Sequence, residues 1–127
     1  MSIKVASVPC GSCPYRRDVP SGIWEQCEYD KLPSYDGPMW SQTPALFLCH
    51  QKDGNACAGW LACHDPRELL AVRMARDLDR SVYDYSTTVP VFSSGAEARR
   101  HGMRDIRRPG AKAHKMMAGL IRQKSAE

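Results

Sequence analysis

The sequence of 127 residues lacks several features that would point to a function class at once. No apolar run approaches the roughly 18 residues that cross a membrane, and the first ten residues are too short and too mixed for a secretion signal. No glycine-rich phosphate loop and no internal repeat is present. We therefore expect a soluble, cytoplasmic protein with no membrane partner, no identifiable small-molecule substrate and no assigned catalytic residue.

Regular periodicity is scarce in the first third of the chain. Residues 1–44 are rich in Pro, Gly and Ser, and they carry aromatic residues only at intervals. A loop segment of this length is uncommon in a compact domain unless something holds it in place. We expect an ordered, loop-dominated layer, and a metal ion is one way to pin it.

Six cysteines are present, and the way they are spaced predicts a metal site. In a reducing compartment such cysteines indicate metal ligands, redox groups or buried thiols rather than a disulfide framework. Cys10 and Cys13 form a Cys-x-x-Cys turn, which is typical of one half of a tetrahedral site. Cys49 and Cys57 lie on either side of a turn signal, which makes them the preferred second pair.

The remaining candidate ligands are held in reserve. They are Cys63, His50 and His64, whereas Cys27 is expected to be a free thiol. The residue types do not distinguish zinc from a [4Fe-4S] cluster, because both use four thiolates and a proline after a ligand cysteine, as at Pro14, is typical of clusters. Zinc is the expected cofactor and [4Fe-4S] its alternative.

An enzymatic interpretation treats Cys10 and Cys13 as a thiol-disulfide pair. Arg16 or Arg17 would then lower the pKa of a thiol. The pair is neither preceded by a clear buried strand nor followed by an amphipathic helix, so the usual setting of such a motif is missing. A non-enzymatic role is favoured. The two arginines can also pair with Asp18 or extend a positive surface, and these roles stay open.

Periodic patterns are clearer in the second half. The sequence predicts short strands at 45–49 and 89–93, and three helices at about 66–82, at 94–102 and at 113–121. We therefore expect a small, irregular α+β fold, in which a metal-pinned loop layer with one or two short strands packs on about three helices. Residues 1–127 are expected to form a single domain, with a cysteine-rich part at 1–64 and a helical, basic part at 65–127.

Positive charge is concentrated near the C-terminus. Residues 94–124 hold nine Lys or Arg against two Asp or Glu, a distribution typical of surfaces that meet phosphates or acidic partners. DNA, RNA or a protein of the transcription machinery is the expected partner. The alternative is a protein-interaction module with a purely structural metal. The candidate nucleic-acid-binding residues are Arg99, Arg100, Arg104, Arg107, Arg108, Lys112 and Lys115.

The segments CGSCPYRRDVPSG, ALFLCH and CAGW together resemble an uncharacterised family of short proteins from actinobacteria and their phages. Members of that family pair a CPWR or CPYR segment with later FxCH and CAGW segments. The resemblance covers roughly residues 9–73 and implies no established reaction. It implies that Cys10, Cys13, Cys49 and Cys57 are the shared cysteines.

Overall fold

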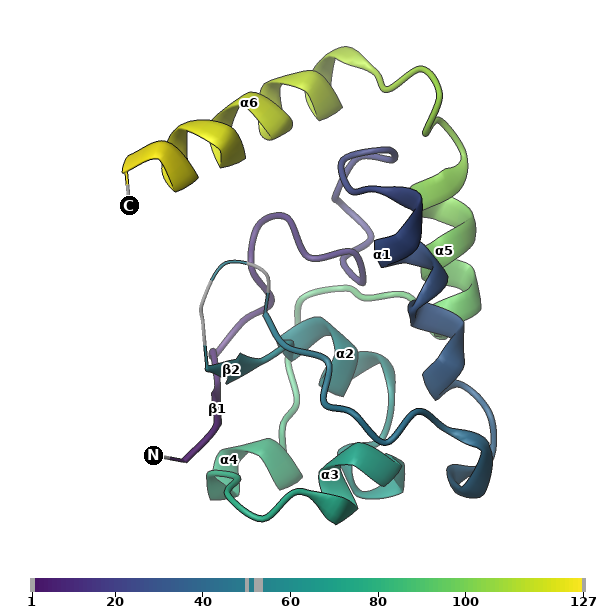
Figure 1. The fold of residues 1–127 in the computed structure, drawn as a ribbon, viewed down its shortest axis with the longest axis vertical. Helices are drawn as coiled ribbons and strands as arrows, with labels where there is room; N and C mark the ends of the chain where they lie inside the picture. The colour runs from purple at the N-terminus through teal and green to yellow at the C-terminus, as the bar shows by residue number, and fades with distance from the viewer. Residues whose placement is uncertain (1, 50, 52–53, 127) are drawn as a thin grey trace.

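The computed structural model describes residues 2–49, 51 and 54–126, with side chains described as far as Ile121. Short elements and loops form a layer at the lower left and centre of Figure 1, and α6 lies apart at the top. The predicted small, irregular α+β class is confirmed. No helix in the described part of the chain is both long enough and apolar enough to cross a lipid bilayer.

The helices and strands are β1 (Lys4–Val5), α1 (Gln26–Asp30), η1 (Leu32–Tyr35), η2 (Met39–Ser41), β2 (Asn55–Ala56), α2 (Ala58–Cys63), η3 (Pro66–Glu68), α3 (Leu70–Met74), α4 (Arg80–Tyr83), α5 (Gly95–Met103) and α6 (Ala111–Ala126), with η denoting a 3-10 helix.

The sheet contains only two short strands, β1 and β2, which pair in parallel with Val5 opposite Ala56. The predicted strand at 45–49 is reduced to one antiparallel bridge between Leu48 and Ala56. Likewise, the predicted strand at 89–93 is reduced to a bridge between Val91 and Arg16. Each segment forms only one β-bridge, after which the chain continues as a loop. Both strand predictions were therefore wrong in extent.

The predicted continuous helix at 66–82 is wrong, because the segment forms the three short helices η3, α3 and α4. Gln42 Oε1 accepts the backbone N–H of Leu70 at 2.9 Å, which starts α3 as a separate helix. Between α3 and α4 the chain unwinds to pair with Ile3, whose N–H donates to the Asp77 carbonyl at 2.7 Å and whose carbonyl accepts the Asp79 N–H at 2.8 Å. Tertiary pairing with the N-terminal segment thus overrides the apolar spacing.

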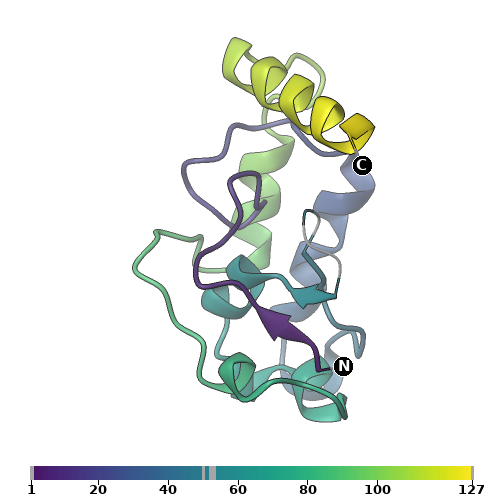
Figure 2. The ribbon, with the colours of Figure 1, turned by 90° about the vertical axis from the view of Figure 1, so that its left-hand side faces the viewer.

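The two predicted C-terminal helices are confirmed as α5 and α6. The Ser94 hydroxyl accepts the Glu97 N–H at 3.0 Å and begins α5, as the capping pattern predicts. A Cβ at Gly102 would overlap the ring of Tyr29, so glycine at this position lets α1 lie directly against α5. Figures 1 and 2 both show α1 and α5 side by side. α6 packs through Ala113 on a separate small cluster with Val19 and Ile23.

Candidate metal centre

Two cysteines from distant parts of the chain meet in the core. The Sγ atoms of Cys13 and Cys57 lie 3.6 Å apart, although the two residues are 44 positions apart in sequence. Both side chains are buried, with exposures of 1% and 3%. We call this contact the thiol pair. A tetrahedral zinc ion with Zn–S bonds of about 2.3 Å holds its sulfurs about 3.8 Å apart, so the spacing of the pair is close to that of two ligands on one ion.

Local backbone structure positions each half of the thiol pair. The N–H of Cys13 donates to the carbonyl of Cys10 at 3.0 Å and closes the Cys-x-x-Cys turn. Cys57 is the N-cap residue directly before α2, and its N–H donates to the Phe47 carbonyl at 2.8 Å. A Cβ at Gly59 would overlap Cys13 Sγ and would lie 2.8 Å from Tyr15 Cβ. Glycine at this position therefore allows the turn to reach α2.

Cys49 lies on the same hairpin as Cys57. The N–H of Cys49 donates to the Asn55 carbonyl at 2.8 Å, and the neighbouring Leu48 pairs with Ala56. In this register Cys49 and Cys57 share one face as diagonal neighbours, a relationship that typically separates residues by about 7–8 Å. The pairing of the two flanking segments brings both cysteines to the same face, whereas residues 50 and 52–53 of the predicted turn lie outside the described residues.

The segment after Cys49 also contacts the Cys-x-x-Cys turn. Gln51 Nε2 donates to the Ser12 hydroxyl at 2.6 Å, and Trp24 Nε1 donates to the Ser12 carbonyl at 2.8 Å. Ser12 is 1% exposed, so both contacts are made to a buried residue, although the contacts themselves are only partly buried. They draw three separate segments together around Cys10 and Cys13.

The structure does not contain an assembled set of ligands. Among residues 2–49, 51 and 54–126, no three or more His, Cys, Asp or Glu side chains are arranged to hold a metal ion. Cys27 is exposed on α1. The reserve candidate Cys63 is at the far end of α2 from Cys57, and His50 is outside the described residues. The structure thus brings together Cys13 and Cys57, with Cys10 and Cys49 on adjoining segments.

Protonation of the thiols follows from their contacts and burial. A hydrogen-bonding interaction with Cys13, together with burial, raises the pKa of Cys10 far above its usual value. Cys10 in turn lowers the pKa of Cys13, but the hydrogen bond with Cys57 and burial raise it more, so the net direction is upward. Burial also raises the pKa of Cys63 to about 12. Cys10, Cys13 and Cys63 are therefore protonated thiols at neutral pH when no metal is bound.

The two arginines that follow the turn have structural partners. Arg16 forms a bidentate pair with Asp18, at 2.9 and 2.8 Å, and also donates to the Pro9 carbonyl at 2.9 Å. Arg17 donates to Glu97 Oε1 at 2.9 Å. Arg16 therefore closes its own loop, and Arg17 ties that loop to α5. The sequence left open whether these arginines lower a thiol pKa, pair with Asp18 or extend a positive surface. In the structure Arg16 pairs with Asp18.

A second polar group, which spacing did not predict, lies around His64. Its Nε2 is 3.8 Å from Asp36 Oδ1, and its ring stands edge-on to Tyr15. Burial lowers the pKa of His64, and the Asp36 charge opposes that shift only in part. Within the described part of the chain, the buried polar atoms Tyr15 Oη, Trp60 Nε1 and His64 Nε2 have no hydrogen-bond partner. His64 is accordingly neutral at neutral pH, with a buried Nε2 on a largely buried ring.

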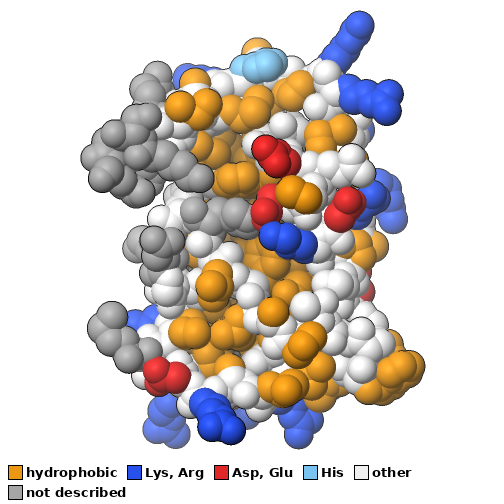
Figure 3. Space-filling view, viewed as in Figure 1, with side chains coloured by type: hydrophobic (Ala, Val, Ile, Leu, Met, Phe, Trp, Pro, Cys, Tyr) orange, Lys and Arg blue, Asp and Glu red, His pale blue; other side chains and the backbone are white. Residues whose placement is uncertain are grey.

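The candidate basic residues are spread over α5, the following loop and α6. Arg99 Nε donates to Asp30 Oδ1 at 2.8 Å, and Arg104 pairs with Asp105 at 3.5 Å. Within the described residues, the other five side chains are exposed and make no hydrogen bond or ion pair. On the face in Figure 3, Lys and Arg side chains stand mainly at the upper right and lower edges. The five unpaired residues are Arg100, Arg107, Arg108, Lys112 and Lys115.

The fold and site define a small, irregular α+β protein with a buried thiol pair and a cationic C-terminal part. The chain belongs to a family of unknown function, DUF6283, whose profile matches residues 5–121. No curated protein and no solved structure matches it.

The sequence did not reveal the roles of Gly59, Ser12 and Gln51 in this site. Only the glycine two residues after Cys57 could have signalled a close approach, since glycine is common where another chain segment comes near.

Proposed function

We propose that this protein binds one metal ion through cysteine thiolates and that the ion stabilises the N-terminal loop layer. The observation that carries this proposal is the 3.6 Å Sγ–Sγ distance between Cys13 and Cys57. Cys10 and Cys49 are the remaining proposed ligands, because the Cys-x-x-Cys turn carries Cys10 on the same turn as Cys13 and the hairpin carries Cys49 on the strand paired with that of Cys57. Binding would draw both thiols inward and displace their protons, as is usual where metal binding and folding are linked.

Zinc is the metal that the thiol spacing favours. In a [4Fe-4S] cluster each cysteine binds a different iron atom, so the ligand sulfurs do not share an edge around one ion. Around a single tetrahedral ion they do, at a spacing near the 3.6 Å between Cys13 and Cys57. A [4Fe-4S] cluster is the alternative, and its visible absorbance would identify it. Thiolate ligation also fits a reducing, cytoplasmic location.

Metal analysis of anaerobically purified protein tests the proposal. We expect one zinc per chain without visible absorbance, whereas a brown chromophore would identify a cluster. Cys57→Ser should abolish metal retention and unfold the loop layer, and Cys27→Ser, at an exposed cysteine outside the site, should keep both. Wild-type protein that is folded, reduced and free of metal after growth in zinc-supplemented medium would contradict the proposal.

A thiol-disulfide function for Cys10 and Cys13 is less well supported. A reactive thiol needs a lowered pKa, whereas contacts and burial raise the pKa of both. Arg16, the nearest candidate for lowering them, is engaged with Asp18 and the Pro9 carbonyl. A disulfide-reduction assay with wild-type protein and Cys10→Ser checks this alternative, and we expect no activity that depends on Cys10.

We further propose that the C-terminal part contacts nucleic acid. Five exposed cationic side chains that form no hydrogen bond or ion pair within the described residues support this second function, since such groups are available for phosphates. The resemblance to proteins of actinobacteria and their phages is compatible with a partner in the transcription machinery. Affinity for duplex DNA should fall steeply between about 50 and 200 mM salt. Salt-insensitive binding would contradict the proposal, and partners that survive nuclease treatment in a pull-down would favour the protein-interaction alternative.

A further inference from the structure

Helix α5 has two faces of opposite character. The face turned inward carries only small residues, Gly95, Ala98 and Gly102, all of which are buried. A Cβ at Gly95 would overlap the Leu32 carbonyl oxygen, and a Cβ at Gly102 would overlap the Tyr29 ring, so this face packs closely on the backbone of η1 and on a side chain of α1. Large side chains are thereby left to another face of the helix.

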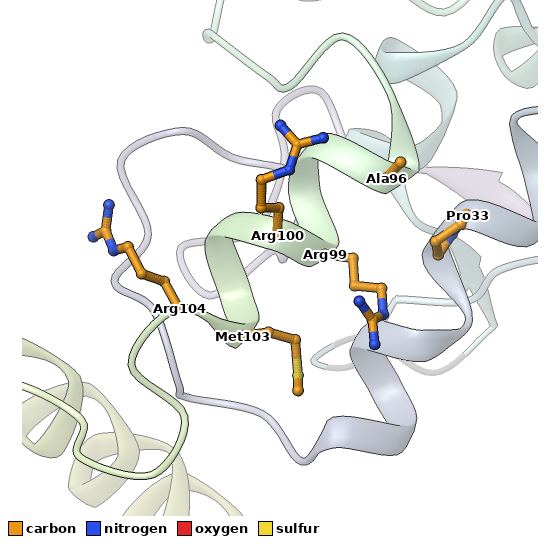
Figure 4. A pocket seen from close by; sticks show the side chains of 6 residues that line it. All are labelled: Pro33, Ala96, Arg99, Arg100, Met103 and Arg104. Carbon is orange, nitrogen blue, oxygen red and sulfur yellow. The ribbon is translucent and has the colours of Figure 1, made fainter.

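The outer face of α5 forms a pocket. Ala96, Arg99, Arg100 and Met103 recur at helical spacing along this face. A cavity of about 410 Å³ lies between them and η1, and we call it the α5 pocket. In Figure 4, Arg99 and Met103 point toward the segment of Pro33, whereas Arg100 and Arg104 extend outward. The lining residues are Pro33, Ala96, Arg99, Arg100, Met103 and Arg104.

Positive charge exceeds negative charge around the α5 pocket. Asp30 neutralises Arg99 through its contact at 2.8 Å, and Asp105 reaches Arg104 only at 3.5 Å. Arg100 makes no hydrogen bond or ion pair with any described residue. The nearby carboxylate of Glu97 is held by Arg17 at 2.9 Å. An anion that enters the pocket therefore meets guanidinium groups whose charge is not fully balanced.

The lining suits a ligand that combines an anionic group with an apolar one. Guanidinium groups bind phosphate oxygens through paired, charge-assisted hydrogen bonds, and long exposed side chains such as Arg100 and Arg104 rotate freely enough to converge on a ligand. Met103, Pro33 and Ala96 supply apolar surface for a sugar or base. We infer that the α5 pocket binds the phosphate of a nucleotide unit. This inference rests on the proposed nucleic-acid contact and assigns it a site.

The phosphate can come from a free nucleotide or from a nucleic-acid strand, and competition separates the two. The experiment measures the fluorescence anisotropy of a labelled single-stranded oligothymidine bound to the full-length protein. Unlabelled AMP, inorganic phosphate, unlabelled oligothymidine and an oligoglutamate peptide serve as competitors. Competition by AMP identifies a free nucleotide as the source, whereas competition by the strand alone identifies nucleic acid. If oligoglutamate competes at the same concentrations as unlabelled oligothymidine, the inference is overturned, because the pocket then binds an acidic peptide as well as it binds a nucleic-acid strand.

A charge-reversed variant with a matched control locates the binding. Arg100→Glu should weaken oligothymidine binding by about tenfold or more, since it replaces an attractive contact by a repulsive one at the ligand. The control is Arg76→Glu, which makes the same charge change at another exposed arginine, between α3 and α4. It should weaken binding by no more than about twofold to threefold, through the change in overall charge alone.

Two negative results have different meanings. Equal weakening by Arg100→Glu and Arg76→Glu, with salt-sensitive binding retained, would overturn the α5 pocket and leave the nucleic-acid contact standing. Absence of binding by both oligothymidine and AMP to folded wild-type protein would remove the proposed contact and the pocket together. Circular dichroism of each variant confirms that the comparison is made between folded proteins.

Discussion

The thiol pair and the basic C-terminal surface place their functional groups in opposite ways. Cys13 and Cys57 are buried, and their positions depend on a turn, a hairpin and a helix start that meet at one point. The exposed cations are distributed along α5, α6 and the loop between them, and each is placed by its own helix or loop. One region is built by long-range contacts, and the other by local helix structure.

This difference determines how each region should respond to substitution. A convergent buried site loses its geometry as a whole, because each side chain is held by the others. Dispersed surface charges act almost independently and leave the fold unaffected. Substitutions in the two regions test this contrast, and the largest changes in stability are expected in the thiol region.

The closest approach in the thiol region occurs at Gly59. Gly59→Ala would place a Cβ against Cys13 Sγ and Tyr15 Cβ, so the turn and α2 must separate. We expect a loss of about 1–3 kcal/mol in the free energy of unfolding, as for other overpacked cores. We also expect weaker zinc retention. Urea denaturation and metal analysis of the purified variant measure the two effects.

Two other glycines provide controls for Gly59→Ala. Gly102→Ala should destabilise the protein by overlap with Tyr29 but should spare zinc retention, because it lies at the α1–α5 contact. Gly119→Ala meets no atom within 4 Å and should leave stability unchanged, or raise it by about 0.5–1 kcal/mol through helix propensity. Equal zinc loss from the variants at 59 and 102 would show that retention merely follows overall stability.

The second-largest effect is expected at the start of α5. The Asp36 carboxylate accepts the N–H groups of Gly95 at 2.6 Å and Ala96 at 2.8 Å, so one distant side chain satisfies two free donors of the helix. Asp36→Asn should cost about 1–2 kcal/mol, because one acceptor oxygen and a favourable negative charge are removed. Thermal unfolding measures the loss. Asp84→Asn, at an exposed pair with Arg67, makes the same chemical change, and a loss as large as that from Asp36→Asn would contradict the capping role.

The helical part was predicted from sequence only where the helix is held by local interactions. Ser94 and Glu97 define the start of α5 within four residues, and the structure follows them. In the segment 66–82 the same kind of apolar spacing failed. Met74 is 62% exposed, and Leu78 pairs with Ile3 rather than continuing a helical stripe. Pairing between residues 75 positions apart cannot be read from a local pattern.

The cysteine region was predicted in its parts. The turn signal between Cys49 and Cys57 correctly indicated a hairpin, and the Cys-x-x-Cys spacing correctly indicated a turn. The meeting of Cys13 with Cys57 depends on Gly59 and on how the chain folds between two residues 44 positions apart, and neither follows from spacing. The ligand set stays a prediction.

A smaller effect is expected from the buried histidine. Because burial lowers the pKa of His64 in the folded state, the unfolded state takes up its proton at a higher pH than the folded state does. The resulting stability is complete above the ordinary histidine pKa of about 6.5 and is lost as pH falls toward the lower folded value. Unfolding free energies at pH 7 and 5 should therefore differ more for wild type than for His64→Gln. The control His114→Gln, at an exposed site on α6, should retain the wild-type difference, and an unchanged difference in His64→Gln would contradict the prediction.

The smallest effects are expected on α6, where Lys112 and Lys115 are exposed and make no ion pair within the described residues. Lys112→Ala and Lys115→Ala should each weaken duplex DNA binding by about twofold to threefold and change stability by less than about 0.5 kcal/mol. Because the contacts are independent, the double variant should show the product of the two binding losses.

The corresponding pair in the thiol region should behave differently. Cys13→Ser and Cys57→Ser should each abolish zinc retention, so the double variant should be no worse than either single one. Titrations against duplex DNA and metal analysis of the two sets give the comparison. Additive partial losses of zinc from the cysteine variants, or loss of all DNA binding from one lysine variant, would contradict the division of the molecule into a convergent site and a dispersed surface.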